Sequence, residues 1–131
     1  PTARKFRPQP DAWSITEIIC HLHDVDRDIN LPRLQQILSG TNPFLPGIQS
    51  DDWATQRNYQ SQNDAVAFNH FCDARSQLTA QLDQLTPAEL QLPARHAIFG
   101  PTNLQELVGF MVQHDRTHIQ QIISNISAAN Q

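Results

Sequence analysis

Apolar residues that recur every three or four positions constrain the fold of this chain more than any other feature of its sequence. This spacing places apolar side chains on one face of an α-helix, whereas strict alternation would predict a strand. It is sustained over residues 15–38, 64–85 and 104–126, and no segment shows strand-like alternation. The sequence therefore predicts an all-α domain built on three long helices.

The first helix has the clearest start. Ser14 can accept a hydrogen bond from the backbone N–H of Glu17, and the Glu17 carboxylate can reach back to the backbone N–H of Ser14. This reciprocal pair predicts a helix that begins at Ile15. Pro32 lacks a backbone N–H and its ring crowds the carbonyl of Asp28, so we expect the helix to kink or restart there.

The remaining boundaries are set by turn and capping residues. Residues 40–60 contain prolines and glycines without a sustained period, and predict a long connection. Thr86 and Glu89 repeat the capping pattern and predict a short helical turn over residues 89–92. Two caps are possible for the last helix: Thr102 with Gln105, or Asn103 with Glu106. The expected core faces are Phe68, Phe71, Arg75, Leu78, Leu82 and Leu85 on the second helix, and Leu104, Leu107, Val108, Met111, Ile119, Ile122 and Ile126 on the last.

Length and charge limit the domain organisation and the partners. We expect a lead-in (residues 1–12), one helical-bundle domain (residues 13–127) and a short tail (residues 128–131). No apolar run approaches the ~18 residues of a membrane span. The net charge is −4 and the nine cations are scattered, which argues against nucleic-acid and anionic-membrane partners. We expect Cys20 and Cys72 to be buried, reduced packing residues of a cytoplasmic protein.

Histidine is the anomaly of the composition, with six residues. His114 and His118 are four positions apart, so their Cβ atoms lie roughly 5–6 Å apart on one helix face and both rings can converge on one ion. Alternatively, both rings are partly buried and hydrogen-bonded to backbone or polar groups. The first helix offers His21 or His23 as a third ligand, and periodicity alone does not choose between them. Two histidines are expected to be ordinary exposed residues: His70 and His96.

Two charged residues project toward the centres of apolar faces, Arg75 on the second helix and Asp115 on the last. A buried unpaired charge costs several kcal/mol, so we expect these residues to pair. Alternatively, one helix is rotated and Asp115 meets water. As a functional role, Asp115 or Glu17 could accept a hydrogen bond from a ligand imidazole and orient it. For Glu17, the capping role is the simpler expectation.

Four segments together resemble the DinB/YfiT-like superfamily of bacterial four-helix-bundle metalloproteins. The most specific parts are W-S-x-x-E-x-x-x-H near the start and H-D-x-x-H near the end. Carried over residue by residue, the metal ligands of the family fall on His21, His114 and His118, so the resemblance selects His21 over His23. The segments are WSITEIICHLHDVD, NPFLPGIQSDDWATQRNYQ, FCDARSQLTAQLDQL and FGPTNLQELVGFMVQHDRTHIQQI.

The resemblance implies a divalent transition metal, such as Zn, Ni or Fe, with coordination positions left open for water or substrate. It implies a metal-dependent hydrolase or a thiol S-transferase that uses a low-molecular-weight thiol, acting on a small-molecule substrate. A different class is a non-catalytic metal-binding stress or interaction protein. Peptide hydrolysis is a weaker candidate, because Asp115 stands where H-E-x-x-H has a glutamate and is one methylene shorter.

One departure from the family pattern concerns the start of the chain. The family's bundle has a helix before the Trp-Ser start, whereas residues 1–12 show no helical period. We therefore expect a DinB-like four-helix bundle that lacks its first helix in this chain. Either the missing segment lies outside this chain, or two subunits cover each other's exposed faces as a homodimer.

Overall fold

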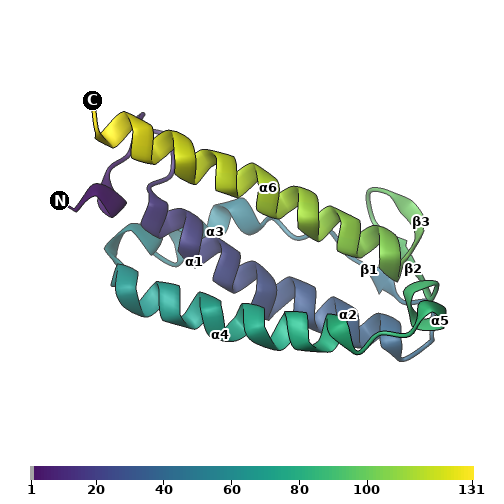
Figure 1. The fold of residues 1–131 in the computed structure, drawn as a ribbon. Helices are drawn as coiled ribbons and strands as arrows, with labels where there is room; N and C mark the ends of the chain where they lie inside the picture. Colours follow the sequence, from purple (N-terminus) through teal and green to yellow (C-terminus); the bar gives the residue numbers. More distant parts are fainter. Residues whose placement is uncertain (1) are drawn as a thin grey trace.

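Helices make up most of the chain, as the apolar periodicity predicts. The computed structural model describes residues 2–131. Helices α1 and α2 follow one another as a single rod, α4 lies beside this rod, and α6 crosses on its other side (Figure 1). The long elements are α1 (Ile15–Val25), α2 (Leu31–Leu38), α4 (Asp64–Asp83) and α6 (Leu104–Ala129).

A single π-helical turn, Asp26–Asn30, joins α1 to α2. The backbone N–H of Leu31 bonds to the carbonyl of Asp26, five residues earlier. Pro32 is then the second residue of α2 and comes just after the widened turn, at the place where its ring and its missing N–H would disturb a regular α-helix. The expected interruption near Pro32 is confirmed, and its form is a widened turn of the kind that often accompanies functional sites.

The expected caps are present. The side chain of Ser14 accepts from the backbone N–H of Glu17, and Glu17 Oε2 accepts from the backbone N–H of Ser14 at 2.7 Å. For α6 the cap is Asn103, whose side-chain oxygen accepts from the backbone N–H of Glu106 at 2.9 Å. Thr102, the alternative cap, instead donates to the Glu106 carboxylate.

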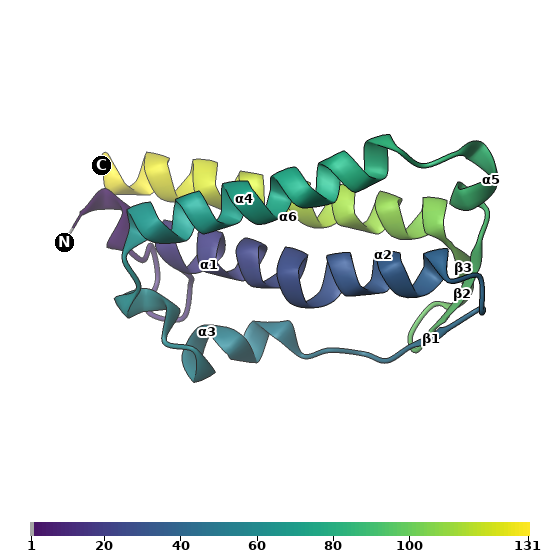
Figure 2. The same cartoon turned by 90° about the horizontal axis from the view of Figure 1, so that it is seen from below.

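The connections are more ordered than the sequence indicated (Figure 2). A 3₁₀ turn lies within the lead-in at Ala3–Lys5. The long connection between α2 and α4 holds two further 3₁₀ turns and one short helix along the side of the α1–α2 rod. These elements are Ser50–Asp52, α3 (Trp53–Gln56) and Tyr59–Ser61. The second capping box starts α5 (Pro87–Leu90), slightly earlier than expected.

The expectation that no strands form was wrong. A three-stranded sheet closes the far end of the bundle, with β1 parallel to β2 and β2 antiparallel to β3. The strands are β1 (Phe44–Leu45), β2 (Pro93–His96) and β3 (Gly100–Asn103). Two to four residues are too few for alternation to stand out in the sequence, and β1 and β2 come from loops far apart along the chain.

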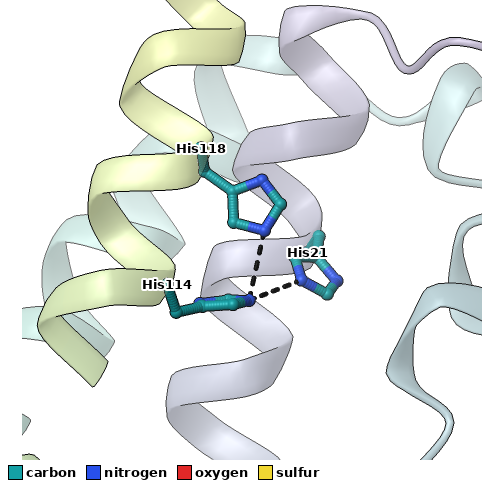
Figure 3. A group of neighbouring side chains, drawn as sticks. All are labelled: His21, His114 and His118. Atoms are coloured by element: carbon teal, nitrogen blue, oxygen red, sulfur yellow. Dashed lines mark hydrogen bonds between the residues drawn. The ribbon is translucent and has the colours of Figure 1, made fainter. Parts of the chain in front are cut away.

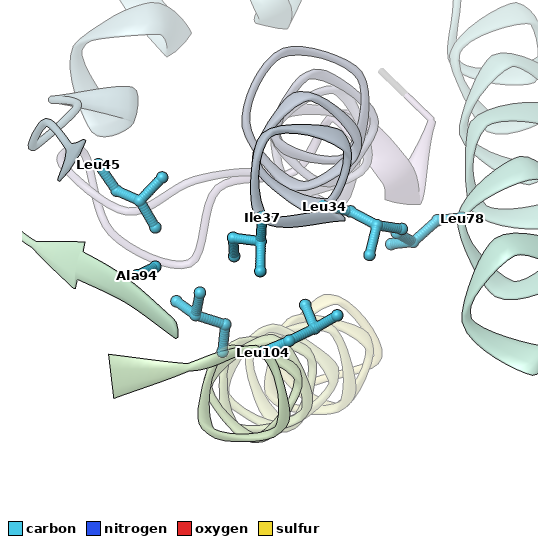
Figure 4. Close-up of a cluster of buried hydrophobic side chains, with 7 residues drawn as sticks. Leu34, Ile37, Leu45, Leu78, Ala94 and Leu104 are labelled. Atoms are coloured by element: carbon cyan, nitrogen blue, oxygen red, sulfur yellow. The ribbon is translucent and has the colours of Figure 1, made fainter. Parts of the chain in front are cut away.

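The main apolar core lies at the sheet end of the bundle (Figure 4). Side chains from α2, α4 and α6 meet there with residues of β1 and β2. Its buried members are Leu34, Ile37, Leu45, Leu78, Ala94, Leu104 and Leu107. A second small cluster, Cys20, Ala54, Tyr59 and Ala67, packs at the other end.

Several side chains expected in the core are exposed. Phe68, Ile119 and Ile126 are each about half accessible to solvent. The inner face of the distal half of α6 is instead formed by polar residues, His118 and Asn125, and the Asn125 side chain donates to the Trp13 carbonyl at 2.8 Å. The hydrogen bonds of these polar groups, which periodicity does not register, set the rotation of the helix.

Cys20 is buried as expected, but the prediction for Cys72 was wrong, because it lies on the outer side of α4. Within residues 2–131, no helix combines the length and the apolarity that a membrane crossing requires.

Candidate metal centre

Three histidine side chains from two helices converge between α1 and α6 (Figure 3). His21 comes from the middle of α1, and His114 and His118 lie one turn apart on α6. The Nε2 atom of His114 lies 3.1 Å from Nε2 of His21 and 3.1 Å from Nε2 of His118. The helical spacing of the α6 pair and the inward orientation of His21 therefore bring three ring nitrogens to one point.

These contacts fit a cation better than a hydrogen-bond network. A ring nitrogen carries either one N–H or one in-plane lone pair, so Nε2 of His114 can form only one of its two contacts as a hydrogen bond. A tetrahedral metal with bonds of 2.0–2.1 Å to nitrogen separates its ligand atoms by about 3.3 Å. The two separations measured from His114 are close to this value, and the three ligand atoms all lie within 4.8 Å of one another.

The surroundings keep the rings of His21 and His114 neutral, as metal ligation requires. Burial lowers the pKa of His21 to about 3, and the neighbouring His118 and His114 add to this effect. Burial also lowers the pKa of His114, again with a contribution from His118. Neutral imidazoles present a lone pair rather than a second N–H, so the site is prepared to bind a cation.

Hydrogen bonding on the outer side of the cluster fixes the tautomer of one ring. Nδ1 of His118 lies 2.8 Å from Oε1 of Gln121. Because an amide oxygen only accepts, the proton of this ring is on Nδ1 and the lone pair on Nε2 faces the other histidines. Sequence reasoning missed Gln121, although its position three residues after His118 on the same helix was a usable signal.

In the described part of the chain, the outer ring nitrogen of His21, unlike that of His118, has no side-chain partner. Its Nδ1 is buried and makes no hydrogen bond within residues 2–131. The backbone carbonyl of Ser50 is nevertheless close enough to raise the pKa of this ring in opposition to burial. The 3₁₀ turn that carries Ser50 therefore lies near this ring.

Glu17 and Asp115 form their hydrogen bonds elsewhere. Glu17 bonds to the backbone of Ser14 and forms an ion pair with Arg7, which the sequence did not predict. Asp115 accepts two hydrogen bonds from Arg75, at 2.7 and 2.9 Å, so the expected pair is confirmed. Within residues 2–131, neither carboxylate bonds to a ring of the histidine cluster.

The ion pair of Arg75 is part of a larger network. Its guanidinium also donates to the buried carboxylate of Asp26, from Nε at 2.7 Å and from the second terminal nitrogen at 3.2 Å. Asp26 additionally accepts from Asn30 at 2.9 Å. Two carboxylates from different helices therefore share one cation beneath the histidine cluster.

The other histidines lie apart from the cluster. His23 bonds to Asp24 at 2.8 Å, and its ring lies 5.7 Å from the exposed ring of His70. The expectation for His96 was wrong, because it is buried on the inward face of β2. Its Nδ1 accepts from the backbone of the following turn, an arrangement that only the unpredicted sheet brings about.

Two cavities flank the cluster, and His114 lines both. One, of about 260 Å³, is largely apolar and extends toward the sheet. The other, of about 480 Å³, is lined by polar groups that include Asp11, Asp51 and Gln121. The indole of Trp13 stacks near His118, with 6.1 Å between ring centroids. The cluster is therefore reachable from both a polar and an apolar side.

Comparison with known proteins agrees with this architecture. The sequence matches the DinB superfamily over residues 2–122, which is most of the chain. The chain belongs to the DinB superfamily. This DinB protein is also similar in structure to YfiT from Bacillus subtilis, described as a probable metal-dependent hydrolase with an unusual four-helix bundle topology.

The match to YfiT has a TM-score of 0.81 at 17% sequence identity and covers 95% of this chain and 71% of that one. At this identity the likeness establishes the DinB fold of the present chain. A comparison with curated proteins finds none that matches the sequence.

Proposed function

We propose that this DinB protein is a metal-dependent hydrolase of small molecules, with His21, His114 and His118 as the ligands of one divalent transition metal such as Zn, Ni or Fe. The observation that carries the proposal is the pair of 3.1 Å contacts made by one Nε2 atom, which a cation explains and hydrogen bonding does not. The description of YfiT as a probable metal-dependent hydrolase supports the same activity for this chain.

A metal held by three imidazoles supplies Lewis acidity and lowers the pKa of a bound water or thiol. The chain's own residues supply the rest. Gln121 holds the ring of His118 in the ligating tautomer. Asp11 and Asp51 line the polar cavity beside the histidines, where a carboxylate can accept a proton. The apolar cavity on the other side offers room for the body of a substrate.

The first test is metal content. Protein purified under metal-replete conditions should hold one divalent metal ion per chain, and His118→Ala should lose it. His70→Ala is the matched control, because His70 is exposed and lies outside the cluster, and it should retain the metal. Absence of metal from the wild-type protein would defeat the proposal.

The second test is activity. The metal-loaded protein should hydrolyse members of a panel of small esters and amides, and chelation should abolish turnover. The same panel should include thiols with electrophiles, because a site of this type can also activate a thiol. Turnover only with thiols would replace hydrolysis by thiol transfer. Full metal loading without turnover of any kind would favour the non-catalytic metal-binding protein.

A further inference from the structure

The apolar cavity beside His114 has an open, apolar mouth. Its walls come mainly from α2 and α6, and the hairpin turn between β2 and β3 lies at its edge. Ile48, Ile98, Phe99 and Phe110 line it and are all substantially exposed. The rings of Phe99 and Phe110 stack with centroids 4.5 Å apart. Exposed apolar groups around a concave site are typical of a small-molecule binding site.

One cation lines this cavity without a carboxylate partner. Arg33 donates one hydrogen bond to the carbonyl of Pro46 at 2.7 Å and forms no ion pair within residues 2–131. No Asp or Glu is among the residues that line the cavity. Burial lowers the pKa of the Arg33 guanidinium. The positive charge is therefore partly removed from water without a neighbouring carboxylate, among the described residues, to balance it. The remaining N–H groups of Arg33 are free to bind an anion.

A second donor, His96, lines the same cavity as Arg33. Nδ1 of His96 accepts hydrogen bonds from the backbone N–H groups of Ile98 at 3.0 Å and Phe99 at 3.3 Å. The proton of the neutral ring is therefore on Nε2, where it can be donated to a ligand. Burial lowers the pKa of His96, and the charge of Arg33 lowers it further.

We propose that this cavity binds a small organic anion, with its apolar body against Ile48, Phe99 and Phe110 and its carboxylate or phosphonate group on Arg33 and His96. A cavity of 150 Å³ is sufficient for benzene, so about 260 Å³ accommodates a ring with a short chain. This proposal rests on the proposed function in one respect: if the metal is catalytic, the anion bound here is the class of molecule that is presented to it. Anion binding itself does not require the metal.

Calorimetric titration with matched small molecules tests the anion site. The probes are 3-phenylpropionate, benzylphosphonate and the neutral 3-phenylpropionamide. The wild-type protein should prefer at least one of the two acids over the amide by roughly tenfold or more, because charge-assisted hydrogen bonds are the strong ones. Whichever of the two acids binds more tightly identifies the preferred head group, carboxylate or phosphonate. Equal affinity for acids and amide, or no binding of any probe, would overturn the proposal.

Two variants test whether Arg33 causes the preference for the acids over the amide. Arg33→Gln should reduce it to about equal affinity for acid and amide, whereas Arg95→Gln should leave it unchanged. Arg95 is the matched control, since it also donates to a backbone carbonyl, that of Asn42, but does not line the cavity. Thermal unfolding checks that each variant folds. A tenfold preference that persists in folded Arg33→Gln would overturn the assignment of the head group to Arg33.

A measurement on the wild-type protein removes the dependence on variants. The Nε2–H signal of His96 in nitrogen-15 spectra should shift on addition of the preferred acid and not of the amide; an unchanged signal would contradict the proposed contact.

A last variant separates the anion site from the metal site. His21→Gln should lose the metal and keep the preference for the acid. In the wild-type protein, metal binding with no preference for the acid would overturn the anion site alone, whereas a preference for the acid with no bound metal would overturn the proposed function alone.

Discussion

Replacing Arg75 by methionine should destabilise the fold by an amount that the structure allows us to work out. The Asp26 side chain is only 1% exposed, and three of its contacts to nitrogen are made with Arg75 and Asn30 at 2.7 to 3.2 Å. In Arg75→Met, this buried carboxylate keeps only the Asn30 bond. Breaking a buried ion pair from one side costs about 3–5 kcal/mol. Asp115 is 27% exposed and can turn toward water, so Asp115→Asn should cost about 1 kcal/mol or less.

Urea unfolding followed by circular dichroism measures these differences, with an unchanged slope as the check that the unfolded state is comparable. Arg116→Met is the matched control, because Arg116 is an exposed arginine of α6, and it should change stability by less than about 0.5 kcal/mol. A loss below 1 kcal/mol at pH 7 would refute the reasoning.

Three further predictions concern acid stability, metal affinity and assembly. A hydrogen bond from Arg27 contributes most to lowering the pKa of Asp28 to about 2, so this carboxylate stabilises the fold above about pH 4 and the contribution is lost as the pH falls toward 2. Thermal unfolding of Asp28→Asn should accordingly show lower stability at pH 7 and a shallower acid limb; an identical pH profile would be inconsistent with this role. Gln121→Leu should weaken metal binding roughly tenfold to a hundredfold, because the His118 ring loses the acceptor on Nδ1, whereas the exposed Gln120→Leu should not. The homodimer expected from the sequence stays a prediction, which light scattering would contradict by finding a monomer.

Much of the helical frame could be predicted because its signals are local. The reciprocal cap of Ser14 and Glu17 needs only four consecutive residues, and the interruption at Pro32 follows from its covalent structure. The pairing of Arg75 with Asp115 followed from the cost of burying either charge alone. The choice of His21 over His23, in contrast, came from family resemblance, because both flank the apolar face of the same helix.

Other features depend on contacts that no local pattern encodes. The π-helical turn adds a residue to one turn and shifts the phase of the helix, so periodicity could not place Asp26 beside Arg75. The burial of His96 depends on the pairing of β2 with β1 and β3. The rotation of α6 that exposes Ile119 follows from polar residues that find partners inside.

The central claim is that one metal ion sits between three imidazoles, and anomalous X-ray diffraction from crystals grown with the bound metal tests it most directly. We predict a single strong anomalous peak about 2.0–2.1 Å from Nε2 of each of His21, His114 and His118. A metal-replete crystal with no peak at this position, or with its peak on other residues, would contradict the claim.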